Sequence, residues 1–352
     1  MDIAAQSGST KPMPNRNRSL DSFRAIFVFG VLAYHYTVRW TPPEHPVDLY
    51  HYDRHYSSYL ELGKFGVHAF FLLSGFFITV TLVRSKGPIE FLYKRIYRIY
   101  PSFLIACTFT FIVTSVYAPP DFKVTLKDYF LSLTLVPKNL GGLPVDAAYW
   151  SLAIEVKFYV LVAVIYGVLR EKFWMGLIAA AALGFALEFW HPALARGVFL
   201  SQYMSFFLAG TALAFQTTLQ KGHAALTLYA SAAIAYVAHW QTISLHDGST
   251  LLPNLVVIGA ILAVILVTIK GIRIDYGPLP FLGIISYEIY LLHQRLGVIV
   301  ISIAKGRLGT SDLLAGLLAA GLCTSSAFIV NRYLQKPVQG LIGAFWRRLR
   351  PE

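Results

Sequence analysis

The sequence has few charged residues and almost no cysteine. Only 14% of its 352 residues are Asp, Glu, Lys or Arg, against about 25% in an average soluble domain. This shortage of charge argues against a soluble globular enzyme. The two cysteines, Cys107 and Cys323, lie in separate apolar segments, so the sequence predicts neither a disulfide framework nor a cysteine-based metal site.

Long apolar stretches take the place of the missing charge. Apolar residues make up 56% of the chain, and aromatic residues alone make up 15%. Because a helix that spans a bilayer needs about 20 mostly apolar residues, we predict an all-α, polytopic integral membrane helix bundle with about ten transmembrane helices. A weaker stretch, 129–136, is too short to cross. The ten apolar stretches are residues 19–40, 63–83, 100–117, 150–169, 174–190, 198–216, 224–240, 251–269, 279–303 and 313–331.

Basic residues outnumber acidic residues by 30 to 18, which gives a formal net charge of +12. In membrane proteins, Lys and Arg concentrate in the cytoplasmic loops, so we assign the excess to the membrane and not to a nucleic-acid partner. With the N-terminus in the cytoplasm and ten spans, twice as many basic residues fall inside as outside. Both the N- and C-termini are therefore expected in the cytoplasm, and the long loops 41–62 and 118–149 outside.

The apolar stretches follow one another without a soluble domain or a fixed-period repeat. We therefore divide the chain into a cytoplasmic N-terminal tail (1–18), one membrane domain (19–338) and a basic cytoplasmic C-terminal tail (339–352). The first apolar run is too long for a signal-peptide core and is expected to be an uncleaved anchor.

The first apolar stretch contains three ionisable residues, Asp21, Arg24 and His35. Arg24 and His35 are eleven positions apart, which is three helical turns plus about 20°, so they share one face with His35 about 16 Å further along the axis. Asp21 lies one turn before Arg24 on the same stripe. Charges inside a membrane are costly and usually face the bundle interior. The stripe is therefore either the lining of a substrate path or a structural ion pair with a separately satisfied histidine.

A basic segment, FLYKRIYRIYP at residues 91–101, contains Lys94, Arg95 and Arg98. Arg95 and Arg98 are one helical turn apart and are able to hold one anion together, because guanidinium groups match the geometry of phosphate. An ordinary cytoplasmic anchor is the alternative interpretation.

Two more polar faces lie in the fourth and ninth apolar stretches. Ser151 and Glu155 are four residues apart and share a helix face, and Ser286, Tyr290 and His293 share another. A membrane glutamate is able to orient or deprotonate a histidine. The alternative is that both faces simply satisfy polar groups between packed helices.

No metal site is predicted. In loop 41–62, His51, Asp53 and His55 alternate in a way that metal ligands sometimes do, but a solvated loop is the simpler interpretation. The sequence also contains no phosphate-cradling glycine loop, no HExxH and no GxSxG pattern.

These segments, in this order, resemble the acyltransferase-3 family of bacterial integral membrane O-acyltransferases. The segment GVHAFFLLSGFFIT resembles that family's second helix, and QKPV is a degenerate form of its C-terminal pattern. The sequence departs from the family at His68 and Gln335, where many members have Asp and Glu. The other matching positions are Arg24, His35, Arg95, Arg98, Trp150, Ser151, Glu155, Tyr290 and His293.

The resemblance implies a stand-alone enzyme without an extracytoplasmic hydrolase-like domain, located in the bacterial inner (cytoplasmic) membrane. Such an enzyme moves an acyl group, usually acetyl from cytoplasmic acetyl-CoA, to a hydroxyl of a glycan or another envelope or secreted molecule. The expected partners are the lipid bilayer, the acyl-CoA and a carbohydrate or glycolipid acceptor, and no tightly bound cofactor is expected.

The polar residues named above can be given roles that fit this reaction. Arg95 and Arg98, together with Lys94, would hold the CoA phosphates, and the thioester would enter beside Arg24. His35 would act as general base on the acceptor hydroxyl or as a transient acyl carrier, and Glu155 would orient it. The residues expected to contact substrate are Asp21, Ser151, Tyr290 and His293.

A transporter of a small polar or glycan-related substrate is the main alternative, because polar stripes in membrane helices also describe a substrate path. The sequence shows neither paired inverted halves nor helices broken by Gly or Pro at matching positions, which disfavours a transporter. A sensor or scaffold is a third class, but it gives Arg24 and His35 no reason to share a stripe.

Overall fold

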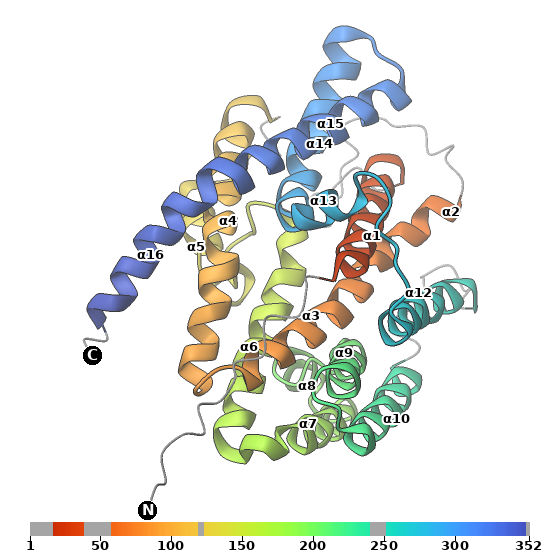
Figure 1. Cartoon of the computed structure of the whole chain (residues 1–352). Helices are drawn as coiled ribbons and strands as arrows, with labels where there is room; N and C mark the ends of the chain where they lie inside the picture. The colour runs from red at the N-terminus through yellow and green to blue at the C-terminus, as the bar shows by residue number, and fades with distance from the viewer. Residues whose placement is uncertain (1–16, 39–57, 119–122, 240–250, 350–352) are drawn as a thin grey trace, which may run out of the picture.

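The structure is a computed structural model, and it is helical throughout the part of the chain that it describes (Figure 1). This finding confirms the predicted all-α class. Residues 41–57 of the predicted outer loop, with the three alternating His and Asp side chains, lie outside the described residues. The described residues are 17–38, 58–118, 123–239 and 251–349.

Eleven helices of fourteen or more residues form the described bundle. They are α1 (Arg18–Thr37), α3 (Gly66–Val83), α4 (Pro88–Tyr117), α6 (Trp150–Leu169), α7 (Phe173–Leu187), α9 (Met204–Thr217), α10 (Gly222–Ala238), α12 (Leu251–Lys270), α14 (Ser286–Leu308), α15 (Asp312–Ile329) and α16 (Gln335–Leu349). The shorter elements are α2 (Ser58–Glu61), η1 (Leu62–Phe65), α5 (Leu126–Ser132), η3 (Pro137–Leu140), η4 (Ala147–Tyr149), η5 (Arg170–Lys172), α8 (Pro192–Gly197), α13 (Leu279–Ile284) and η6 (Val330–Leu334).

Six helical segments of the described chain are long and apolar enough to cross a membrane. Each of the ten predicted stretches contains a helix, but α9 and α10 are shorter than a full span, and α1, with its charged residues, is not among the six. The count of about ten spans and the cytoplasmic termini therefore stay predictions. The six segments are Leu62–Val83, Pro88–Tyr117, Ala147–Leu187, Leu251–Lys270, Ser286–Leu308 and Asp312–Arg348.

Helix α1 is fixed at its start by a cap and by a close crossing. The Asn17 side chain accepts hydrogen bonds from the backbone N–H groups of Ser19 (3.1 Å) and Leu20 (3.3 Å), which satisfies donors that a helix leaves unpaired. Helix α13 crosses α1 so closely that a Cβ on Gly283 would lie 1.7 Å from the carbonyl oxygen of Asp21. Glycine at 283 therefore sets the position of the first turns of α1.

Two of the predicted spans are interrupted within the bundle. The stretch 279–303 is two helices, α13 and α14, which meet at Ile285. Beyond α15, the π-helical segment η6 leads into α16. Non-helical or π-helical backbone at membrane depth is tolerated where it lines a cavity, and residues beside both interruptions do line one.

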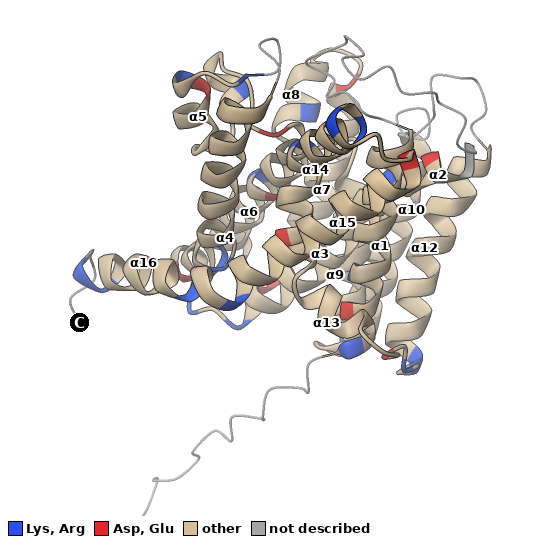
Figure 2. Cartoon of the chain, turned by 90° about the horizontal axis from the view of Figure 1, so that it is seen from above, with Lys and Arg blue, Asp and Glu red and all other residues tan. Residues whose placement is uncertain are grey.

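Charged side chains gather mainly toward the two ends of the bundle, and α16 extends sideways at one of them (Figure 2). Residues 335–349, which the sequence division assigned partly to the membrane domain and partly to a tail, form this single helix. Charge at both ends and apolar surface between them is the pattern expected of a membrane bundle.

Candidate functional site

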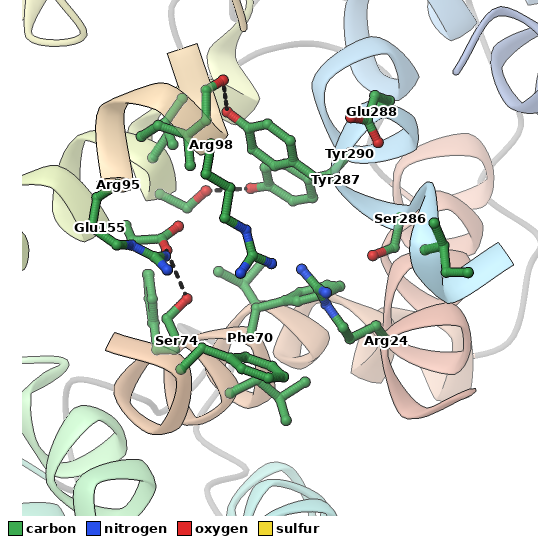
Figure 3. A pocket seen from close by; sticks show the side chains of 18 of the residues that line it. Arg24, Phe70, Ser74, Arg95, Arg98, Glu155, Ser286, Tyr287, Glu288 and Tyr290 are labelled. Atoms are coloured by element: carbon green, nitrogen blue, oxygen red, sulfur yellow. Dashed lines mark hydrogen bonds and ion pairs between the residues drawn. The ribbon is translucent and has the colours of Figure 1, made fainter. Parts of the chain in front are cut away.

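A pocket of about 170 Å³ lies between α1, α3, α4, α6 and the break before α14 (Figure 3). Because polar groups inside a membrane bundle are costly, a polar pocket in this position is a candidate functional site. Six of the residues predicted from the sequence line it. The charged and polar lining residues are Arg24, Ser74, Arg95, Arg98, Ser151, Glu155, Ser286, Tyr287, Glu288, Tyr290, Asn331 and Gln335.

Two guanidinium groups form one end of the pocket. Arg24 from α1 and Arg98 from α4 point toward each other (Figure 3), and both lie near the ring of Phe77, at 5.8 and 5.7 Å from its centroid. Arg24 also lies 3.9 Å from the carboxylate of Asp21. Two guanidinium groups beside one aromatic ring give this end of the pocket several N–H donors, which are suited to an anionic ligand.

Arg95, one turn before Arg98, belongs to a separate network. Its Nη2 donates to the hydroxyl of Tyr159 (2.7 Å) and lies 3.3 Å from Glu155 Oε1. The same carboxylate oxygen accepts hydrogen bonds from Ser74 Oγ (2.9 Å) and from Tyr159. Since Arg95 is only 3% exposed, its charge is neutralised within this network, which holds Glu155 in place.

This network differs from the sequence-based hypothesis in two respects. Arg95 and Arg98 share a helix face, but Arg95 pairs with Glu155 while Arg98 faces Arg24, so the two do not converge on one point. The described hydrogen bonds of Glu155 go to Ser74, Arg95 and Tyr159 and not to His35.

Ser151 and Tyr290 close the other end of the pocket. Their hydroxyl oxygens are 2.7 Å apart, and the Tyr290 hydroxyl also lies 3.0 Å from the carbonyl oxygen of Ala148, to which it donates. These contacts tie α14 to the start of α6. The polar groups at this end are therefore neutral hydroxyls, in contrast to the two arginines.

A pair of histidines lies directly behind Tyr290. The ring centroids of His35 and His293 are 5.0 Å apart, and the His293 ring is 5.2 Å from that of Tyr290. His293 Nδ1 is 2.7 Å from the carbonyl oxygen of Tyr290. Because a carbonyl only accepts, Nδ1 carries the proton and Nε2 holds a lone pair. Nε2 is buried and has no hydrogen-bond partner among the described residues, so its lone pair is able to accept a proton or a hydrogen bond.

The structure thus separates the predicted site residues into three groups. Arg24, Arg95, Arg98, Ser151, Glu155 and Tyr290 line the pocket. His35 and His293 lie behind its wall. Asp21 lines a different hollow beside the start of α1, and Lys94 pairs with Glu90 at 2.7 Å, outside the lining.

Several lining residues were not assigned to the site from the sequence. Ser74 is one of four polar residues in the otherwise apolar helix α3, together with His68, Thr79 and Thr81, so its position in the sequence did not single it out. Tyr287, which lines the pocket, and Tyr159, which contacts Arg95 and Glu155 behind it, are of a residue type too common in membrane helices to stand out. Asn331 reaches the pocket from the π-helical segment η6. In the parts of the chain that the structure describes, no three His, Cys, Asp or Glu side chains come together as metal ligands.

The fold and this pocket define a multi-pass membrane protein with a polar site enclosed by its helices. Residues 17–332 match the family model described as an acyltransferase domain. The chain belongs to the acyltransferase-3 family of membrane acyltransferases, which confirms the resemblance noted in the sequence.

Two kinds of relative share part of the sequence. The O-acetyltransferase OatA of Staphylococcus aureus is 26% identical over 174 residues, which cover 44% of this chain and 25% of OatA. The putative membrane-bound transacylase BcsY of Komagataeibacter xylinus is 22% identical over 332 residues, which cover 88% of this chain and 80% of BcsY. The chain thus spans a quarter of the length of OatA. No solved structure matches it.

Proposed function

We propose that this protein transfers an acyl group, most simply acetyl, from a cytoplasmic acyl-CoA to a hydroxyl of a glycan or another envelope or secreted molecule. The observation that carries the proposal is the polarity of one pocket: two guanidinium groups at one end, and hydroxyls backed by two imidazoles at the other. Membership of the acyltransferase-3 family and the similarity to an O-acetyltransferase support this reaction.

Arg24 and Arg98 would receive the donor. CoA is the anionic partner in the reaction, and guanidinium groups bind phosphate oxygens through paired hydrogen bonds. In this arrangement Arg98 contacts the donor phosphates and Arg24 lies beside the thioester. Arg95 also lines the pocket, but its side chain pairs with Glu155 and Tyr159, so its proposed role is to position these two residues while Arg98 binds the donor phosphates.

The acceptor hydroxyl would be activated at the histidine end. His35 takes the hydroxyl proton, the resulting oxygen nucleophile attacks the thioester carbonyl, and the CoA thiolate leaves and recovers the proton from the imidazolium. Tyr290 lines the pocket beside Ser151, and its ring contacts that of His293, so Ser151 and Tyr290 would position the hydroxyl. The inner membrane is the proposed location, because the donor is cytoplasmic and the acceptor belongs to the envelope.

A transfer assay with purified protein tests the proposal. The full chain, reconstituted in nanodiscs, is incubated with radiolabelled acetyl-CoA and glycan fractions, and acylated products are identified by mass spectrometry. We expect release of CoA together with an ester on the acceptor, and loss of both in His35→Gln. Acceptor movement across vesicle membranes without ester formation would instead support a transporter and contradict the proposal.

A further inference from the structure

Helix α16 differs from the other long helices in having three distinct faces. At 100° per residue, Leu341 and Phe345 lie about 40° apart, and Lys336 and Arg347 lie about 20° apart on a side about 150° away. Leu341 is 72% exposed and Phe345 is 64% exposed. A helix with an apolar face and a basic face on opposite sides is typical of one that lies in the membrane–water interface.

The third face fastens α16 to α4. Trp346 stacks on Tyr93 with the ring centroids 4.2 Å apart and the planes 12° from parallel. A Cβ on Gly343 would be 3.5 Å from the ring of Tyr97, and Gln339 Nε2 donates to the Tyr97 carbonyl at 3.4 Å. The helix is therefore held in a fixed orientation, and Figure 2 shows it extending sideways from the bundle.

The charge of α16 has one sign. Its fifteen residues include Lys336, Arg347 and Arg348 and no Asp or Glu. All three basic residues are exposed. Lys336 and Arg347 form the basic face, whereas Arg348, at the end of the helix, lies about 20° from Leu341 at the edge of the apolar face, where a long basic side chain is able to reach the headgroups. A helix at a bilayer surface meets acyl chains on one side and anionic phosphate groups beside it, which favours basic residues without acidic ones.

We propose that α16 lies in the plane of the membrane surface and binds anionic phospholipid headgroups, with Leu341 and Phe345 among the acyl chains. The site is separate from the proposed acyl-CoA pocket. It borders that pocket, because Gln335 at the start of α16 and Asn331 just before it are lining residues. The lipid would thereby support one wall of the pocket.

Spin labels on single cysteines test the orientation. Nitroxides at Leu341→Cys and Phe345→Cys are compared with one at Gly340→Cys, where a Cβ meets open space, in full-length protein with Cys107→Ala and Cys323→Ala. In nanodiscs, we expect collisions with dissolved oxygen at 341 and 345 and with an aqueous nickel chelate at 340. Nickel collisions at all three sites would show that α16 lies in water, and oxygen collisions at all three would show that it spans the bilayer. Collisions with neither reagent at 341 and 345 would show that protein covers the apolar face. Each of these results would overturn the proposal.

Lipid charge is tested on the same protein by amide hydrogen exchange. In phosphatidylglycerol-containing nanodiscs, residues 336–349 should exchange more slowly than in phosphatidylcholine alone. Because one basic residue near an anionic surface is worth about a fivefold change in affinity, Arg347→Gln with Arg348→Gln should remove most of that difference. Lys270→Gln with Arg273→Gln, an equal charge change at the end of α12, should preserve it. Equal exchange in the two lipids, or equal loss in both double variants, would refute anionic-lipid binding, whatever the transfer assay shows.

Discussion

The two ends of the pocket differ in the polar groups that line them. At one end, Arg24 and Arg98 both lie beside the ring of Phe77. At the other end, Ser151 and Tyr290 bond to each other at 2.7 Å, and His293 donates to a backbone carbonyl. The difference indicates a division of labour, because an anionic donor needs cations, whereas a neutral hydroxyl needs a base and hydrogen-bonding partners.

The largest effect should come from the histidine end. His35→Gln keeps a hydrogen-bonding side chain but is unable to take a proton, and loss of a general base typically lowers the rate by about 10²–10⁴-fold. We expect transfer to fall by this factor while thermal unfolding stays near that of the wild type. Transfer at a near-normal rate would assign the chemistry to His293 or Glu155 instead.

Substitutions of Arg95 and Arg98 should differ in their effect on the stability of the protein, although the two residues are one turn apart. Removing one partner of a buried ion pair leaves the other charge uncompensated and costs about 3–5 kcal/mol. Arg95→Met should therefore unfold at a clearly lower temperature, because it strands Glu155, and Arg98→Met is the matched control that should not. The added change Glu155→Leu should recover much of the loss. Equal unfolding temperatures for the two single variants would show that Arg95 is not a structural cation.

Gly283→Ala should disturb the guanidinium end alone. Its Cβ would lie 1.7 Å from the Asp21 carbonyl, so α1 or α13 must shift, and overpacking of this kind costs about 1–3 kcal/mol. Because Arg24 is one turn from Asp21, we expect the KM for acyl-CoA to rise more than the KM for the acceptor. Gly222→Ala, where a Cβ meets open space, is the control. A larger rise for the acceptor would break the proposed division.

Tyr290→Phe should have the smallest effect and act at the opposite end. The change removes the hydroxyl that contacts Ser151 and Ala148, which is worth about 1 kcal/mol. Ser151 is able to donate to Ala148 in its place, since its Oγ already lies 3.3 Å from that carbonyl. We expect a few-fold rise in the acceptor KM with an unchanged donor KM, measured by steady-state kinetics.

The sequence predicted the helical class and six of the pocket residues for a simple physical reason. A charged or polar side chain in an apolar helix turns toward the interior, so the positions of Arg24 and Glu155 in apolar stretches indicated a polar site. Arg98 lies in the basic segment before the third stretch and was assigned through the family resemblance. Helical spacing does not show which residue on another helix is the partner. It placed Arg95 beside Arg98, whereas contact across the bundle pairs Arg95 with Glu155.

The local breaks in the helical backbone also could not be predicted from the sequence. The stretch 279–303 combines apolar residues with a polar helix face, and its helical periodicity did not mark the break at Ile285 that places Ser286 in the pocket. The π-helical segment η6 had no signal either, so Asn331 was missed. Both features depend on packing between distant parts of the chain.

Binding of acetyl-CoA to His35→Gln and Arg98→Ala, measured side by side by titration calorimetry, tests the division between the two ends most directly. We expect His35→Gln to bind the donor as tightly as the wild type. Arg98→Ala should bind it at least tenfold more weakly, because a hydrogen bond to a charged group contributes about 1.5–3 kcal/mol. Donor affinity lost equally in both variants, or retained in Arg98→Ala, would contradict this division.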